Sequence, residues 1–203
     1  MTPRVAVLVS GSGTNLQALL DAQGRGELGA DIALVISNRP GVKALERAAA
    51  AGVTHAVIEH KSYASREDFD AALRDRVRAS GATLVVLAGF MRVLTRVFLD
   101  AFPDAVLNVH PALLPSFPGV DAQAQALAYG VKLTGCTVHL VDAGVDTGPI
   151  VSQSAVEVRD DDTVDTLRAR VLAEEHRLLP AAVRDLAAGR LRREGRRVVR
   201  VAP

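Results

Sequence analysis

Asn108 and His110 are the residues of this sequence best suited to catalysis. They stand two positions apart in the segment LNVHP, so in a strand both side chains project from the same face. An amide and an imidazole on one face can both donate hydrogen bonds to an oxyanion, and the imidazole can also transfer a proton. Pro111, Pro115 and Pro118 follow and stiffen the loop. The pattern favours acyl-transfer chemistry over a strand-end histidine with backbone partners.

A glycine-containing loop stands between an apolar run at 5–9 and a run with helical spacing. Backbone N–H groups at the start of a helix favour an anion such as phosphate. The glycines let the backbone approach it closely, and Thr14 and Asn15 can add side-chain donors. Leu16 stands where the dinucleotide-binding pattern needs a third glycine, and no lysine follows to make a P-loop. From these residues alone, two interpretations of the loop are equally supported: a phosphate-binding site, and a tight turn in which Asn15 caps the helix.

The segment from Asp142 to Pro149 places two carboxylates and two glycines between two predicted strands. A carboxylate beside a histidine favours the cationic imidazole, so Asp146 could serve His110 in this way. The alternative is a solvated hairpin loop, which is the commoner use of such a segment. The residues alone leave both interpretations open.

The other histidines and the single cysteine are interpreted as structural. His55 and His60 flank a short strand and are expected at the surface, while His139 is expected to be a core residue with satisfied contacts. His176 lies in a long predicted helix. No pair of histidines has metal-ligand spacing, and Cys136 has no second cysteine to pair with. We therefore expect no metal and no intramolecular disulfide.

Alternating strands and helices in the first half predict an α/β fold, a mostly parallel central sheet with helices on both faces. Ligands then sit at the carboxyl ends of the strands, where the segments described above fall. The second half has two strands with no helix between them, which predicts antiparallel pairing and a mixed sheet. The expected strands are 5–9, 32–36, 55–58, 84–88, 106–109, 137–141, 150–158 and 198–201, and the expected helices begin near 14 and cover 42–51, 65–79 and 164–179, the last ended by Pro180.

Length and composition restrict the function classes. The 203 residues predict a single domain over 1–203, and 49% hydrophobic residues are ordinary globular composition. A net charge of +1 and 3% aromatic residues disfavour binding to nucleic acid. The seven arginines between 184 and 200 are expected in a solvated amphipathic tail. The apolar runs are too short for a signal peptide or a membrane span, so a cytoplasmic protein without membrane contact is expected.

The chain resembles the phosphoribosylglycinamide formyltransferase family of folate-dependent enzymes. The resemblance covers nearly the whole chain, and the Asn-x-His-Pro-x-Leu-Leu-Pro segment together with the later Asp-x-Gly-Pro is highly specific. The segments that carry it are VLVSGSGTNLQAL, SNRPGVKALERA, VVLAGFMRVL, LNVHPALLPSFPG, GCTVHLVDAGVDTGPI and EEHRLLP.

The resemblance implies a Rossmann-like formyltransferase fold and a reaction of de novo purine biosynthesis. The formyl group would pass from 10-formyltetrahydrofolate to the amine of glycinamide ribonucleotide by direct attack, through a tetrahedral intermediate. Residues 1–100 would form the phosphate-binding half, and 101–203 the catalytic and folate-binding half. The enzyme would act on small molecules as a monomer or homodimer.

The resemblance also implies site residues, position by position. Asn108, His110 and Asp146 match the catalytic residues, and the Leu114–Pro115 bond matches one that is cis in relatives. The substrate phosphate would sit on Gly13, Thr14 and Asn15, with Glu175 on the ribose hydroxyls. The folate pocket would be lined by Met91, Arg92, Val93, Leu94, Asp142, Ala143, Gly144 and Val145.

The chain departs from the family in one loop. Relatives commonly carry histidine where this chain has Asp121, and the following segment, which includes Gln123, is less basic. The departure bears on how this loop contacts the substrates, and leaves the catalytic positions unchanged.

Three alternative functions remain open beside formyl transfer to glycinamide ribonucleotide. A formyltetrahydrofolate hydrolase would pass the formyl group to water. A methionyl-tRNA formyltransferase shares the Asn-x-His-Pro segment but adds a C-terminal domain, for which 203 residues are expected to leave no room. A non-catalytic nucleotide-binding module is disfavoured by the incomplete glycine pattern.

Overall fold

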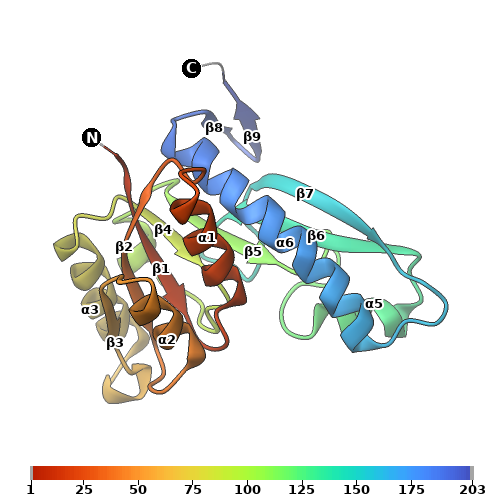
Figure 1. Cartoon of the computed structure of the whole chain (residues 1–203), viewed down its shortest axis with the longest axis horizontal. Coiled ribbons are helices and arrows are strands. Elements are labelled where there is room, and N and C mark those ends of the chain that lie inside the picture. The colour runs from red at the N-terminus through yellow and green to blue at the C-terminus, as the bar shows by residue number, and fades with distance from the viewer. Residues whose placement is uncertain (1, 202–203) are drawn as a thin grey trace.

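The computed structural model describes residues 2–201, and within them nine strands form one sheet in the order β3-β2-β1-β4-β5-β6-β7-β9-β8. Figure 1 shows the sheet running through the molecule with helices on both sides. The strands are β1 (Arg4–Val9), β2 (Asp31–Ser37), β3 (His55–Val57), β4 (Leu84–Leu87), β5 (Val106–His110), β6 (Leu133–Leu140), β7 (Ile150–Glu157), β8 (Leu191–Glu194) and β9 (Arg197–Arg200). The helices are α1 (Thr14–Gly24), α2 (Lys43–Ala50), α3 (Arg66–Ala79), α4 (Arg96–Leu99), α5 (Ala122–Tyr129) and α6 (Val164–Ala187), with a 3₁₀ turn η1 (His60–Ser62).

The parallel half of the sheet is buried on both faces because its strands are almost wholly apolar. In β1, Val5, Val7 and Val9 face α1, α2 and α6, while Ala6 and Leu8 face α3 and α4. Pairings of β1 with β2 and β4, of β2 with β3, and of β4 with β5 are all parallel. The predicted parallel sheet with helices on both faces is confirmed.

The second half is mixed, as predicted. β6 pairs antiparallel with both β5 and β7, and β7 meets β9 in parallel at a single position. The β5–β6 pairing sets Asn108 opposite His139, which places residues from two distant segments at one point of the sheet.

The predicted end of the long helix at Pro180 is wrong. α6 continues to Ala187 with Pro180 inside it. An internal proline removes one backbone hydrogen bond and costs roughly 3 kcal/mol. Beyond the proline, Ala182 and Val183 are buried in the apolar core, and this burial offsets the cost. The sequence reasoning also missed α5 and β8, which are short and only weakly periodic.

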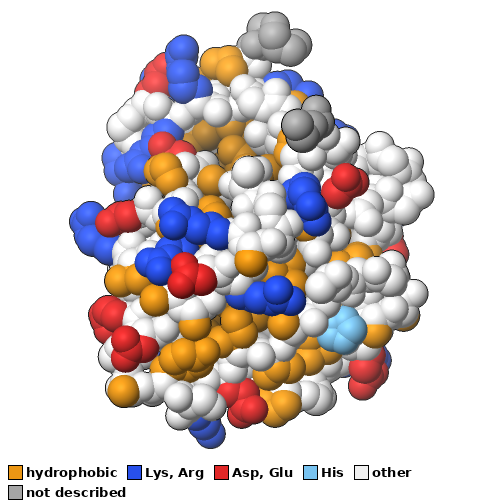
Figure 2. Space-filling model, turned by 90° about the vertical axis from the view of Figure 1, so that its left-hand side faces the viewer, with side chains coloured by type: hydrophobic (Ala, Val, Ile, Leu, Met, Phe, Trp, Pro, Cys, Tyr) orange, Lys and Arg blue, Asp and Glu red, His pale blue; other side chains and the backbone are white. Residues whose placement is uncertain are grey.

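The surface carries both signs of charge. Figure 2 shows positive and negative side chains interspersed on the face that carries α3, in keeping with the net charge of +1. Near the C-terminal end, exposed arginines pair with acidic neighbours, as in Arg192 with Glu194 and Arg193 with Asp104. Among the described helices, none is long and apolar enough to cross a membrane.

Candidate active site

A cleft of about 460 Å³ opens where the strand order reverses, at the carboxyl ends of β1, β4 and β5. This is the crevice in which open α/β sheets bind their ligands. Most residues singled out from the sequence line it. They are Asn15, Met91, Arg92, Val93, Leu94, Asn108, His110, Asp142, Gly144, Val145, Asp146 and Glu175, whereas Gly13, Thr14 and Ala143 lie outside its lining.

Strand β5 presents the amide and the imidazole together. Its Leu107 and Val109 are buried in the core cluster on the α1 and α6 side, so Asn108 and His110 project to the opposite face. His110 is buried and Asn108 is partly exposed to the cleft. The expected common face is confirmed.

Asp146 lies beside both residues, although the residues alone left its position open. Its Oδ2 is 3.3 Å from Nδ1 of His110 and accepts a 2.8 Å hydrogen bond from the backbone N–H of Gly119. Its Oδ1 lies 3.4 Å from Nδ2 of Asn108. Asp146 has a φ of 53°, an uncommon conformation for a residue other than glycine, which aims its side chain into the cleft. The solvated-loop interpretation is therefore wrong for Asp146.

The pKa of Asp146 lies below its ordinary value. Burial favours the neutral acid, but the adjacent imidazole of His139, the hydrogen bond from the Gly119 N–H and the nearby His110 together outweigh burial. The carboxylate is consequently ionised throughout the neutral range, and it supplies a fixed negative charge to this part of the cleft.

His139 belongs to this cluster, which the sequence reasoning missed. It is buried, as expected of a core residue, but its Nε2 lies 3.1 Å from Nδ2 of Asn108. Its Nδ1 lies 2.9 Å from the carbonyl of Leu140, which can only accept, so Nδ1 carries a proton. In the neutral ring Nε2 then accepts from Asn108, and this fixes which way the amide points. Only the antiparallel register of β5 and β6 brings His139 next to Asn108, and the sequence does not reveal this register.

Both ring nitrogens of His110 have protein partners. Nε2 lies 2.8 Å from the carbonyl oxygen of Phe117, in the proline-rich loop, and Nδ1 faces Asp146. The Leu114–Pro115 bond in this loop is cis, as the family resemblance implied. The imidazole is thus held in one orientation from both sides.

At one end of the cleft, Asn15 and Glu175 meet across 160 positions of sequence. Nδ2 of Asn15 donates a 2.7 Å hydrogen bond to Oε2 of Glu175. Burial raises the pKa of Glu175, against the opposing effect of that hydrogen bond. Asn15 is not the helix cap: Gly13 occupies the N-cap position with a φ of 71°, and no side chain caps α1. The alternative of a turn capped by Asn15 is therefore wrong.

The other end of the cleft has an apolar wall. Met91, Val93 and Val145 are 57%, 39% and 50% exposed although all line the cleft, and apolar groups exposed together suggest an apolar ligand. Helix α3 supports this wall: Arg66 donates to the carbonyl of Val93, and the buried carboxylate of Asp70 accepts from the N–H of Thr95.

A hydrogen-bond chain ties the apolar wall to the residues that follow β1 and β2. The N–H of Met91 donates to Oγ of Ser10 at 2.9 Å, and that hydroxyl donates to Oδ1 of Asn38 at 2.6 Å. Asn38 also contacts His60 at 3.2 Å. His60 is therefore only half-exposed, whereas His55 is at the surface as expected.

The loop that departs from the family pattern borders the cleft. Asp121 lines it, and stands at the N-cap of α5 with a φ of 55°. Gln123 is buried.

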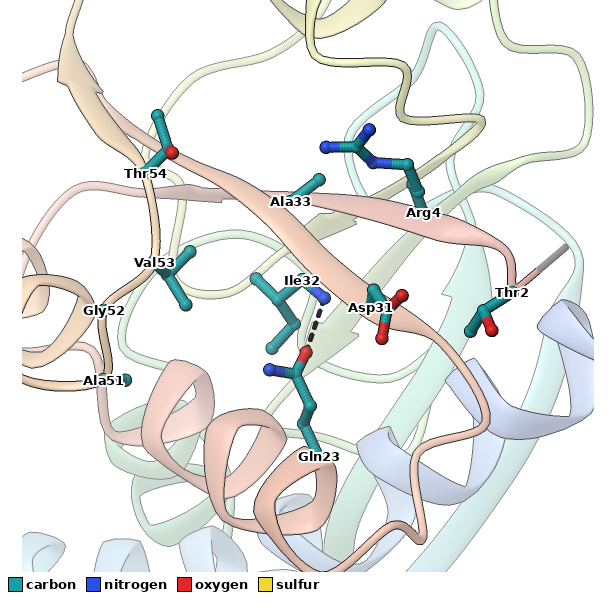
Figure 3. A pocket seen from close by; sticks show the side chains of 10 residues that line it. All are labelled: Thr2, Arg4, Gln23, Asp31, Ile32, Ala33, Ala51, Gly52, Val53 and Thr54. Atoms are coloured by element: carbon teal, nitrogen blue, oxygen red, sulfur yellow. Dashed lines mark hydrogen bonds between the residues drawn. The ribbon is translucent and has the colours of Figure 1, made fainter.

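A second hollow, of about 500 Å³, lies at the other edge of the sheet, near the amino ends of β1 and β2. Figure 3 shows Gln23 inside it, accepting a hydrogen bond from the backbone of Ile32, with Arg4 and Asp31 near the rim. Its lining has no histidine, cysteine or converging carboxylates, so this hollow lacks the catalytic groups of the first cleft. Within residues 2–201, no three His, Cys, Asp or Glu side chains form a metal-binding group.

Known proteins are similar to this chain over nearly its whole length. A family model described as formyl transferase matches residues 3–183. A phosphoribosylglycinamide formyltransferase of Mycobacterium tuberculosis is 48% identical over 184 residues, which cover 91% of this chain and 85% of that protein. The counterpart in Bacillus subtilis is 38% identical, covering 90% of this chain and 94% of that protein.

Solved structures and longer proteins extend the comparison. The crystal structure of glycinamide ribonucleotide transformylase 1 from Symbiobacterium toebii has a TM-score of 0.97 and 54% identity, covering 99% of this chain and 95% of that one. The trifunctional purine biosynthetic protein adenosine-3 of Drosophila melanogaster is 50% identical over 92% of this chain. This chain spans only 14% of that trifunctional relative's length.

Proposed function

The chain belongs to the formyl transferase family, and from this membership we propose that it transfers a formyl group to the amine of glycinamide ribonucleotide. The formyl donor is 10-formyltetrahydrofolate, and the reaction is a step of de novo purine biosynthesis. The observation that carries the proposal is the convergence of Asn108, His110 and Asp146 in one cleft, between a polar end and an apolar end.

The two ends of the cleft match the two substrates chemically. At the polar end, the buried Glu175 can accept hydrogen bonds from ribose hydroxyls, and Asn15 holds its carboxylate in place. The apolar wall at Met91–Leu94 and Val145 suits the flat pterin of the donor. Asp142 and Gly144 line the donor side of the cleft, with Ala143 between them in the sequence.

In the reaction, the neutral amine attacks the formyl carbon and forms a new C–N bond, while the carbonyl oxygen becomes an oxyanion. Asn108 faces this position with an Nδ2 whose contact to Asp146, at 3.4 Å, is long enough to be exchanged for the oxyanion. The tetrahedral intermediate then collapses: the bond to the folate nitrogen breaks, the attacking nitrogen loses a proton and the folate nitrogen gains one.

His110 and Asp146 handle charge and protons during these steps. The ionised Asp146 lies 3.3 Å from Nδ1 of His110, and an N–H of this imidazole can stabilise a developing negative charge by donating a hydrogen bond to it. To donate to the oxyanion, His110 must give up one of its present partners, and the 3.3 Å contact with Asp146 is the longer of the two. A water held by Asp146 carries the proton between the two nitrogens.

A covalent enzyme intermediate has no support in the structure. Cys136 is buried, and burial, with the nearby Glu175 and Glu174, raises the pKa of its thiol to about 12. A thiol of this kind is protonated at neutral pH and does not act as a nucleophile. Direct attack by the substrate amine is therefore the step that these residues suit.

The decisive experiment is a steady-state assay of the protein with both substrates, with formylated product separated and quantified. Product formation dependent on both substrates supports the proposal. No formylated product, from protein shown to be folded by circular dichroism, overturns it. Replacing the acceptor by its dephosphorylated riboside tests the phosphate assignment, and a raised KM is expected.

Omitting the acceptor tests the hydrolase alternative. Rapid release of formate from the donor alone would favour hydrolysis, and the comparisons do not favour this outcome. A single domain over 1–203, a cytoplasmic location and the choice between monomer and homodimer remain predictions within this proposal.

A further inference from the structure

Helix α2 contacts the last three residues, 11–13, of the loop that precedes α1. The N–H of Ala44 donates a 3.1 Å hydrogen bond to the carbonyl of Gly11, and Nε of Arg47 donates a 2.9 Å bond to the carbonyl of Ser12. Gly13 packs so closely on the same helix that a Cβ added there would lie 2.6 Å from Cβ of Ala44. Side chain and backbone of α2 together therefore determine the shape of this loop.

These contacts orient the loop's peptide groups. The peptide bonds here are trans, so the C=O and the following N–H point in opposite directions. With the carbonyls of Gly11 and Ser12 turned toward α2, the N–H groups of Ser12 and Gly13 are turned away from it. Among residues 2–201, no backbone or side-chain acceptor pairs with the N–H groups of residues 12–15. The loop thus presents a row of unpaired donors, as an anion site requires.

Arg47 makes these contacts without a carboxylate partner. Its Nη1 donates a 3.0 Å bond to Oε1 of Gln17, in the first turns of α1, so the one guanidinium ties α2 to the loop and to the helix that follows. Among the ion pairs of the described residues, none involves Arg47. Its guanidinium therefore lies beside the loop with no salt bridge among the described residues.

We propose that Arg47 is a positioning residue for the phosphate of the acceptor substrate: it holds the carbonyl of Ser12 and thereby aims the loop's N–H groups at the phosphate. The inference rests on the proposed function, with the substrate phosphate on Gly13, Thr14 and Asn15 as the family resemblance implies. It acts through the loop geometry, so it concerns the affinity for the phosphorylated substrate and leaves the formyl-transfer step alone.

The groove beside Arg47 offers a matched control. This groove is lined by Arg47, Arg25 and His176 together with Asp21, so both signs of charge face it. Arg25 carries the same charge in the same groove, but its partner is the exposed Glu27 and it has no hydrogen bond to the loop. Arg25→Met therefore removes an equal charge without releasing Ser12.

The experiment compares Arg47→Met, Arg47→Lys and Arg25→Met with the unmodified protein. In Arg47→Met, the KM for glycinamide ribonucleotide is expected to rise about tenfold or more, because the variant loses one charge-assisted hydrogen bond to the loop. The KM for the folate donor and kcat should stay within about threefold, since neither depends on the loop. Arg47→Lys should lie between, because a lysine restores the charge but not the two-pronged contact. Arg25→Met should behave as the unmodified protein.

Direct binding of inorganic phosphate, measured by calorimetry, separates this inference from the proposed function. Weaker phosphate binding in Arg47→Met but not in Arg25→Met supports the role of Arg47, even if the protein fails to formylate glycinamide ribonucleotide. Equal losses in the two methionine variants would overturn it in favour of a general charge effect. Unchanged phosphate affinity and unchanged KM in Arg47→Met would overturn it while leaving formyl transfer intact.

Discussion

Replacing Asp146 by asparagine removes a charge from the proposed catalytic cluster while keeping its shape. The remaining side-chain oxygen can still accept the hydrogen bond from Gly119. The new amide nitrogen then faces Nδ2 of Asn108, donor against donor, and it competes for Nε2 of His139. The variant therefore loses both the counter-charge of His110 and the present orientation of Asn108.

The size of the effect follows from the distance between the two charges. An imidazolium formed at His110 during proton transfer would interact with the Asp146 carboxylate, 3.3 Å away, by about 5 kcal/mol at an effective dielectric constant of about 20. The dipole of the asparagine and water in the cleft offset part of this loss. About 3 to 4 kcal/mol remains, so kcat should fall about 10²- to 10³-fold, in the range seen when a stabilising donor is removed from an oxyanion site.

Single-turnover formylation, with enzyme in excess and product quantified over time, measures this step without product release. Asp104→Asn is the control, because Asp104 has a similar φ of 51° but lies outside the cleft and pairs with the exposed Arg193. A folded Asp146→Asn variant that keeps kcat within tenfold of the unmodified protein would refute the assigned role.

The pH dependence provides an independent check on Asp146. Its pKa is lowered in the folded protein, so its ionised form stabilises the fold above the unfolded carboxyl value, and this stabilisation is lost as pH falls through the lowered value. Asp146 is already ionised at pH 5, so a fall in activity between pH 7 and 5 must come from another group. Asp146→Asn should lower the rate at both pH 7 and pH 5, because the carboxylate that it replaces is ionised at both.

Three further predictions follow from the geometry. Glu175→Gln should raise the free energy of unfolding by about 1 kcal/mol at pH 8, since a buried carboxylate is costly, while raising the KM for the acceptor. The pKa of Glu175 is raised in the folded protein, so the unmodified protein loses stability as pH rises above the pKa of the unfolded chain. The difference in unfolding free energy between Glu175→Gln and the unmodified protein should therefore grow with pH, as measured by urea denaturation. Gly13→Ala should destabilise the fold by about 1–3 kcal/mol through its φ of 71° and the 2.6 Å approach to Ala44, whereas Gly11→Ala meets nothing within 4 Å and should cost little. His139→Leu should lower kcat about tenfold or more, because the amide of Asn108 loses the acceptor that orients it.

Each of these has an outcome that contradicts it. A Glu175→Gln variant with the pH dependence of the unmodified protein would show that Glu175 is not the buried titrating group. Equal unfolding free energies for the two glycine variants would contradict the close packing of Gly13. If His139→Leu keeps the kcat and KM values of the unmodified protein, His139 does not orient the amide of Asn108 for catalysis.

Local patterns in the chain were enough to predict the parallel half of the fold. Continuous apolar runs such as 5–9 and 32–36 can only be buried on both faces, and the helices between them follow from spacing and end signals. The same patterns failed at Pro180, where packing of the helix beyond the proline on the core outweighs a local rule. The short α5, whose eight residues are mostly small and apolar, gave no periodic signal.

For the site, two positions in one strand were sufficient to place Asn108 and His110 on a common face, because alternation is a local property. Contacts between segments far apart in the chain depend on register and on the crossing of elements, which no single segment encodes. His139 meets Asn108 only through the β5–β6 register, Glu175 meets Asn15 across 160 positions, and Arg47 reaches Ser12 from another helix. The residue types determined what chemistry was available, and the packing of the sheet and its helices decided which of them could act together.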